Sequence, residues 1–152
     1  AYAYSFSGSA TVREADEEVA LNILEAARGK PLEAGREIPL TMPVQEVGIM
    51  RAYGGGFFEG EGRAVVYGKE ITNRYECSYG RDQKIGYMAS ADCIVTSTIE
   101  LTAGPVVETF RGQISLVFNN SRNEIQFLMP ALRHQDSDLD IIVNVTGTAK
   151  KI

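Results

Sequence analysis

Asp136, Asp138 and Asp140 alternate along one short segment near the end of the chain. The D-x-D-x-D spacing is that of the first part of a calcium-binding loop, where carboxylate oxygens bind the cation. The match then ends, because Ile141 stands where such a loop has glycine and Gly147 where it has glutamate. Alternate residues of a strand share one face. The three carboxylates therefore predict either a weak calcium site completed by another loop or a solvated strand that discourages edge pairing. No other cofactor is expected.

Two further groups have the residue types for acid–base chemistry. His134 lies in the stretch ALRHQDSD, and histidine is the commonest general base near neutral pH. The segment is polar and reads as a solvated turn, which disfavours a catalytic role. Glu59 and Glu61 share a strand face and have the composition of a paired-carboxylate hydrolase site, although alternating acids on a strand usually face solvent. The sequence contains no Ser/His/Asp motif, metal-ligand cluster or dinucleotide fingerprint, so a non-catalytic role is favoured.

Both cysteines of the chain, Cys77 and Cys93, lie in segments with strand patterning, and a polar turn separates them. A register that opposes the two cysteines keeps every neighbouring pair on a consistent face. Opposed residues at a non-hydrogen-bonded position lie close enough for a disulfide. Zinc sites and redox motifs need closer cysteine spacing. We therefore predict a disulfide, with two buried free thiols as the alternative, and an oxidising compartment: periplasm, cell surface or extracellular space.

The length and charge of the chain narrow its class. A chain of 152 residues suits one domain, here residues 1–152. The net charge of −5 disfavours nucleic acid, which selects a basic surface. No apolar run has the length of a membrane span, so membrane insertion is not expected. The first residue is Ala1 rather than methionine, which is compatible with a removed targeting segment or with trimming.

The N-terminal part of the chain changes its hydrophobic period. Residues 1–12 alternate, with Tyr2, Tyr4 and Phe6 on one side and small residues on the other, as in a half-buried strand. Apolar residues then recur at helical spacing over residues 14–28, behind an acidic start and before Gly29 and Pro31. This pattern predicts one amphipathic helix.

The rest of the chain reads as β structure, with turn chemistry at residues 54–56 and 119–123. Seven strands are expected, at Val44–Tyr53, Phe57–Tyr67, Ile71–Tyr79, Ile85–Thr102, Val106–Phe118, Glu124–Met129 and Leu139–Thr148. The fourth is long enough to bend or break near Ser97. The predicted fold class is mainly β, either all-β or α+β: an antiparallel sandwich or barrel of about seven or eight strands with one N-terminal helix.

Three functions fit these observations. The first is an exported, non-catalytic binding or assembly module, which associates with a protein partner or with itself by exchanging the strand of residues 1–12. The second is a carrier of a small apolar ligand inside a β-barrel, with tyrosines such as Tyr53, Tyr67, Tyr75, Tyr79 and Tyr87, together with Phe57, along its cavity. The third is a hydrolase-like enzyme with a site built from distant loops. The candidate contact residues are Tyr2, Tyr4, Phe6, Tyr53, Phe57 and Phe58.

Overall fold

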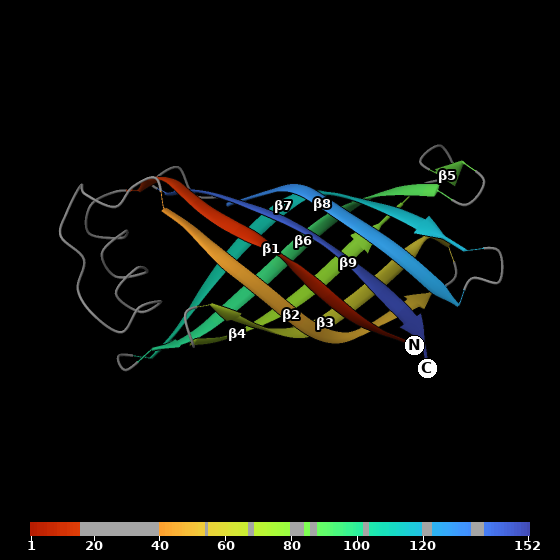
Figure 1. Ribbon diagram of the computed structural model, residues 1–152, viewed down its shortest axis with the longest axis horizontal. Helices are drawn as coiled ribbons and strands as arrows, with labels where there is room; N and C mark the ends of the chain where they lie inside the picture. The colour runs from red at the N-terminus through yellow and green to blue at the C-terminus, as the bar shows by residue number, and fades with distance from the viewer. Residues whose placement is uncertain are drawn as a thin grey trace.

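The chain folds into a closed antiparallel β-barrel. The computed structural model describes residues 1–15, 40–53, 55–66, 69–79, 84–85, 88–101, 104–119, 123–134 and 139–152. The strands are β1 (Tyr2–Ala15), β2 (Leu40–Tyr53), β3 (Phe57–Val66), β4 (Lys69–Ser78), β5 (Lys84–Ile85), β6 (Met88–Leu101), β7 (Gly104–Phe118), β8 (Glu124–His134) and β9 (Leu139–Lys151). Figure 1 shows them crossing obliquely around one axis.

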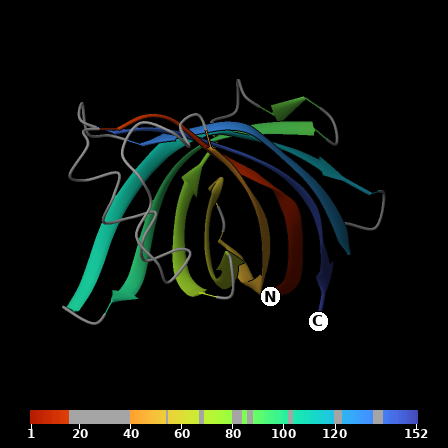
Figure 2. The ribbon, with the colours of Figure 1, turned by 60° about the vertical axis from the view of Figure 1, so that its left-hand side comes forward.

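Each long strand pairs with its neighbours in sequence, and β1 pairs with β9, so that eight strands form a ring. The short β5 pairs with the start of β6 outside this ring. The strands curve around a common interior (Figure 2). Closure leaves no long strand with an unpaired edge, which removes the usual route to edge-to-edge aggregation. The sequence could not distinguish a sandwich from a barrel; the structure is a barrel.

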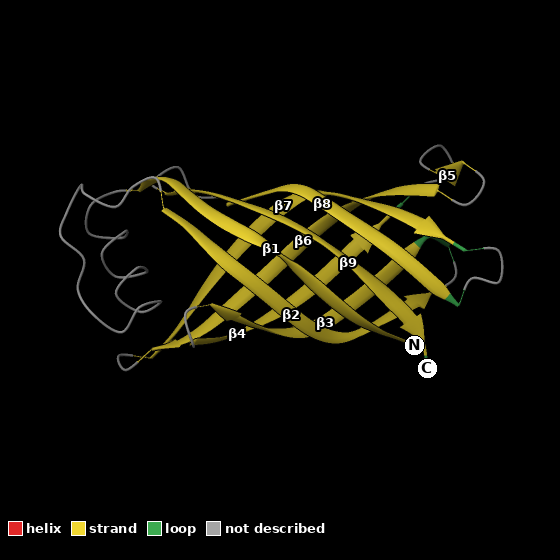
Figure 3. Ribbon diagram, viewed as in Figure 1, coloured by secondary structure: helices red, strands yellow, loops and turns green. Residues whose placement is uncertain are grey.

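Period-two alternation explains why the sheet closes. On β4, for example, Asn73, Tyr75 and Cys77 are buried inside the barrel, whereas Arg74 and Glu76 are exposed. The same alternation runs along the other long strands, so that mainly apolar side chains converge on the axis, whereas the outer wall carries polar residues together with exposed apolar ones such as Val47 and Val107. All described secondary structure is β-strand (Figure 3).

The two ends of the barrel differ. Both chain termini and the β2–β3 and β7–β8 turns lie at one end, which we call the termini end (Figure 1). Its interior is filled by tightly packed side chains, among them Phe58, Leu116 and Ile125. The other end, where β1 ends at Ala15 and β2 begins at Leu40, is called the cavity end. Burial along β7 follows this polarity, because its inward residues are partly exposed toward the cavity end and fully buried at Ile114 and Leu116.

The predicted disulfide is present. Cys77 and Cys93 are direct cross-strand partners on β4 and β6, with Cα atoms 4.2 Å apart. This separation matches the close approach of a non-hydrogen-bonded antiparallel pair. Both sulfur-bearing side chains are buried in the core of the termini end, at 1% and 2% exposure. The disulfide is compatible with an oxidising compartment.

The predicted N-terminal helix at residues 14–28 is not shown. Its first two residues, Glu14 and Ala15, belong to β1 and pair with Asp140 and Leu139 of β9. The remainder of the predicted helix lies outside the described residues. Glu14, the first acid of the expected helix, therefore lies at the end of a strand, where cross-strand pairing takes precedence over local propensity.

The extents of β6 and β8 differ from the sequence-based expectations. The expected strand Ile85–Thr102, long enough to bend or break near Ser97, does not break there, because β6 is continuous over Met88–Leu101; Lys84 and Ile85 form a separate strand, β5, that pairs with the start of β6. The predicted end of a strand at Met129 is also wrong, since β8 continues to His134. The register with both neighbours shifts before Leu132, at the point where Pro130 cannot donate to a ladder. His134 accordingly ends a strand opposite Phe110 rather than lying in a turn.

The two predicted turns are confirmed by their hydrogen bonds and dihedral angles. Gly55 and Gly56 have φ values of 88° and 82°, which side-chain-bearing residues rarely adopt. The Gly56 carbonyl accepts from the Tyr79 amide at 2.8 Å and so ties the β2–β3 turn to the end of β4. In the other turn, the Asn119 side-chain oxygen accepts from the amides of Asn123 and Glu124.

The buried position of the disulfide leads to a first prediction. Replacing both cysteines, as in Cys77→Ala/Cys93→Ala, should cost about 3 kcal/mol of unfolding free energy in the chain-entropy model. For a chain of this size that lowers the melting temperature by roughly 6–12 °C. Thermal unfolding followed by circular dichroism measures the change. Equal melting temperatures for the wild type and the double variant would contradict a stabilising role.

Candidate functional site

The interior of the cavity end is hollow. A cavity of about 130 Å³ lies along the barrel axis and is lined by residues of all eight ring strands, with Ala64 as the one contribution of β3 among the described residues. Its lining residues are Phe6, Ala10, Met42, Val44, Glu46, Ala64, Ile71, Asn73, Tyr75, Val95, Ser97, Ile99, Glu108, Phe110, Met129, Leu132, Ile141, Val143 and Val145. One water molecule needs roughly 10–15 Å³ by such a measure, so the space is large enough for a small organic molecule.

An aromatic cluster separates the cavity from the filled half of the barrel. The rings of Tyr4 and Phe6 stack with centroids 4.4 Å apart, and Tyr75 meets both edge-on at 6.2 Å. Phe127 extends the cluster through an edge contact with Phe6 at 5.4 Å. Such rings are rigid and bury large areas. They form a floor that fixes the depth of the cavity.

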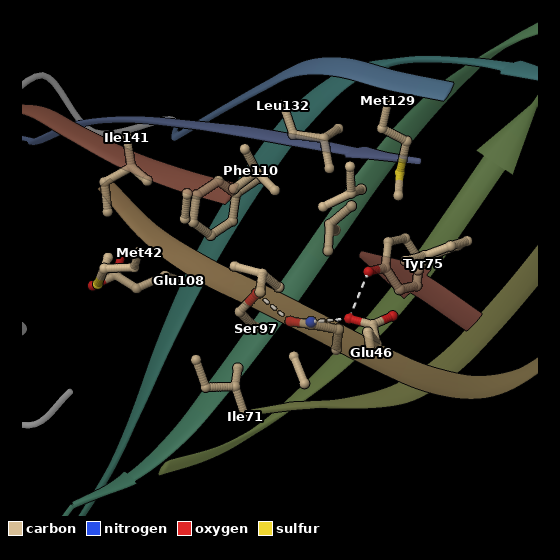
Figure 4. Close-up of a pocket in the computed structure, with 18 of the residues that line it drawn as sticks. Met42, Glu46, Ile71, Tyr75, Ser97, Glu108, Phe110, Met129, Leu132 and Ile141 are labelled. Carbon is tan, nitrogen blue, oxygen red and sulfur yellow. Dashed lines mark hydrogen bonds between the residues drawn. The ribbon is translucent and has the colours of Figure 1, made fainter. Parts of the chain in front are cut away.

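A buried carboxyl group lies where this floor meets the cavity wall. Glu46 of β2 is only 3% exposed. The Tyr4 hydroxyl donates to its Oε2 at 2.7 Å, and the Tyr75 hydroxyl donates to its Oε1 at 2.9 Å. Asn73 Nδ2 also donates to Oε1, while Ser97 donates to Asn73 Oδ1 at 2.5 Å. Figure 4 shows Glu46, Tyr75 and Ser97 of this network beside the apolar lining. No described buried side-chain polar atom lacks a hydrogen-bond partner.

Burial dominates the electrostatics of the network. Removal from water raises the pKa of Glu46 above its ordinary value of 4.5, although hydrogen bonds from Tyr4, Asn73 and Tyr75 act in the opposite direction. Burial also raises the pKa of the Tyr4 phenol, as does the neighbouring Glu46 carboxylate. The same two causes raise the pKa of Tyr75 well above 10. Both phenols therefore remain protonated donors, and Glu46 is the group that titrates.

Two glycines make room for the Tyr4 ring. Gly48 of β2 and Gly62 of β3 lie beside Tyr4 in the register, in the order Tyr4, Gly48, Gly62. A Cβ atom on Gly62 would overlap the Tyr4 hydroxyl and approach the Val47 carbonyl oxygen to 2.8 Å. A Cβ atom on Gly48 would lie 2.6 Å from the Tyr4 ring. The absence of these side chains lets the phenol lie along the wall and reach Glu46.

The predicted contact residues separate into two groups. Tyr2, Tyr4 and Phe6 point into the barrel, where Phe6 lines the cavity and Tyr4 binds Glu46. Phe58 is buried in the filled half, whereas Tyr53 and Phe57 are exposed on the outer face with ring centroids 5.9 Å apart.

Other sequence-derived candidates do not converge on the cavity. Among the described residues proposed as an aromatic cavity lining, the structure places only Tyr75 there, since Tyr53 and Phe57 face outward and Tyr79 packs at the termini end. Tyr67 and Tyr87 lie outside the described residues. Glu59 and Glu61 belong to the outer face of β3.

The weak calcium prediction is not tested. Asp136 and Asp138 lie outside the described residues, and Asp140 is described only as a β9 residue paired with Glu14. Within the described ranges, no three His, Cys, Asp or Glu side chains are grouped to hold a metal ion.

Sequence reasoning missed Glu46, Asn73 and Ser97, although alternation contains the signal. Each is a polar residue in a series of alternate, inward-facing positions that are otherwise mainly apolar, as Met42, Val44 and Met50 are on β2. A polar residue on the apolar face of a strand must find partners inside the barrel.

Comparison with protein-family models, curated proteins and solved structures finds no match to this chain. The described part of the chain contains no helix long and apolar enough to cross a membrane.

The glycine positions lead to a second prediction. Gly62→Ala should displace Tyr4 and cost about 1–3 kcal/mol of unfolding free energy through overpacking. Gly60→Ala on the same strand is the matched control, because its Cβ would meet nothing closer than 3.4 Å. That change should stay within about 1 kcal/mol of the wild type. Urea unfolding measures both, and equal effects would contradict the packing of Tyr4 against Gly62.

Titration of Glu46 leads to a third prediction. Because its pKa is raised on folding, the folded state binds the proton more tightly than the unfolded state. Protonated Glu46 therefore contributes its full stabilisation of the folded state below about pH 4.5. This contribution is lost as the pH rises through the raised pKa of the folded state. The neutral variant Glu46→Gln should therefore gain stability relative to the wild type between pH 4.5 and pH 8. Melting temperatures across this range test the sign, and a constant difference would contradict it.

Proposed function

We propose that the protein binds a small, largely apolar ligand inside the cavity end of the barrel and serves as a carrier for it. An eight-stranded barrel is just wide enough to be filled by side chains or to hold one small ligand. Here the termini end is filled, whereas the cavity end is hollow and has a largely apolar lining. This contrast within one barrel is the observation that supports the proposal.

The construction of the cavity also favours binding. The aromatic floor and the disulfide-containing core keep the termini end rigid, which holds the cavity open without the ligand. A preformed apolar site with a few convergent polar groups is the usual form of a small-molecule site. Glu46, Asn73 and Ser97 provide those polar groups on one side. The role of a carrier in an oxidising compartment agrees with the buried disulfide.

Self-assembly through β1 remains a prediction with less support. β1 pairs along its length with both β2 and β9 of the same chain, so exchange between copies would first break two ladders. The exposed Tyr53 and Phe57 rings are the described candidates for a protein contact on the outer wall.

The four methionines provide internal reporters for ligand binding, which is a fourth prediction. Met42 and Met129 line the cavity, whereas Met50 is buried in the core outside its lining and Met88 is exposed. Addition of 1-hexanol to protein labelled with ¹³C at the methionine methyl groups should shift the resonances of Met42 and Met129. The Met50 and Met88 resonances should shift much less.

A pair of substitutions controls this experiment. Ala64→Leu directs a larger side chain into the cavity and should weaken the hexanol response several-fold, since it occupies the ligand's space. Val65→Leu changes the next residue, which faces outward, and should leave the response unchanged. Shifts spread equally over all four methionines, or an Ala64→Leu response equal to that of the wild type, would contradict binding in the cavity.

A further inference from the structure

The cavity wall is chemically two-sided. Cross-strand pairing places Asn73 beside Ser97 and Ser97 beside Glu108, and Asn73 is bonded to Glu46. These four polar residues come from β2, β4, β6 and β7 and form one polar belt. The facing wall, from β8 and β9, is apolar, with residues such as Leu132 and Val143. Figure 4 shows Leu132 and Met129 on one side of the space and Ser97 and Glu46 on the other.

The polar belt is acidic. Its two titratable members, Glu46 and Glu108, are both carboxyl groups, and the lining contributed by the described residues includes no Lys, Arg or His. A buried carboxylate is costly unless a positive charge or hydrogen-bond donors compensate it. The three donors around Glu46 are neutral, and their effect is smaller than that of burial. The described protein therefore supplies hydrogen bonds to this carboxylate but no counter-charge.

Glu46 retains capacity for one more donor. An ionised carboxylate offers about four acceptor positions, of which Tyr4, Tyr75 and Asn73 use three. Because Glu46 itself lines the cavity, a ligand atom inside the space can use the remaining position. An N–H donor that carries positive charge provides both the missing hydrogen bond and the missing charge.

We propose that the ligand is an organic ammonium ion with a compact apolar body, whose nitrogen lies against the Glu46 carboxylate while its body contacts the wall of β8 and β9. This proposal rests on the carrier function above and specifies the ligand class. A cavity of about 150 Å³ is known to hold one benzene molecule, so a body of about six carbon atoms suits the present space. A bare metal ion would make no use of the apolar wall, and the Glu46 carboxylate alone would bind it poorly. A fatty-acid anion would meet like charge.

Three ligands with the same six-carbon chain test this inference: hexylammonium, 1-hexanol and hexanoate. Their dissociation constants are measured at pH 8 from the Met42 and Met129 methyl shifts. An alkylamine, like a lysine side chain with a pKa near 10.4, is charged at this pH. In the wild type, hexylammonium should bind roughly tenfold or more tightly than hexanol, because a hydrogen bond to a charged group exceeds a neutral one. Hexanoate should bind most weakly.

Glu46→Gln is the decisive variant. In this variant, the ratio of the hexanol dissociation constant to the hexylammonium dissociation constant should fall to about one. Hexanol should still bind, and its binding shows that the variant is folded. Glu76→Gln, on the outward face of β4, removes the same charge outside the cavity and should keep the wild-type ratio. An unchanged ratio in Glu46→Gln, or a ratio lost in Glu108→Gln but kept in Glu46→Gln, would overturn the assignment to Glu46.

The wild type provides a test that needs no substitution. As the pH falls from 8 to about 4.5, protonation of Glu46 should weaken hexylammonium binding, whereas hexanol binding should change little. Tyr4 and Tyr75, which face Glu46 from β1 and β4, stay protonated throughout, and Glu108 → Gln shows whether the second lining carboxyl group contributes. A pH-independent hexylammonium affinity would contradict the proposal.

The two levels of inference fail in different ways. If none of the three ligands shifts the Met42 and Met129 resonances, the carrier function itself is wrong. If hexanol shifts them but hexylammonium binds no more tightly, the carrier function stands and the ammonium class is wrong.

Discussion

The hydrogen bonds to Glu46 link the architecture of this barrel to its chemistry. Tyr4 from β1 and Tyr75 and Asn73 from β4 converge on one carboxyl group of β2, so that three strands of the ring share a buried polar junction. Tyr4 and Tyr75 also belong to the aromatic floor, whose rings stack and meet edge-on. Moving any one of them would open a void and leave a buried polar atom unsatisfied. The position of the carboxyl group and the depth of the cavity are therefore set by the same contacts.

Residue size determines which half of the barrel is hollow. At the termini end, bulky side chains and the Cys77–Cys93 disulfide fill the axis. Toward the cavity end, the inward side chains leave space, and small residues such as Ala10 and Ala64 are among them. Gly48 and Gly62 act between the two halves, because they let the Tyr4 ring lie flat against the wall. One strand pattern thus yields a rigid support and a binding space.

Much of the fold was predictable, because alternation and turn chemistry are local signals. The strands, the two turns and the disulfide follow from residue parity around positions such as Cys77, Cys93 and Gly55. Closure into a barrel was not predictable, since sandwiches and barrels share the two-residue period. The site was largely missed, because aromatic residues were chosen as candidates, whereas the polar residues at inward positions were the informative ones. Glu46 could have been found as the one acid on the apolar face of β2, but its partners on β1 and β4 depend on long-range register.

A crystal structure of the wild-type protein grown with hexylammonium at pH 8 tests the central claim most directly. The account predicts ligand density inside the cavity end, with the nitrogen within hydrogen-bond distance of a Glu46 oxygen and the hydrocarbon chain against β8 and β9. A cavity that holds only water at saturating ligand, or a ligand bound solely on the outer wall, would contradict the account.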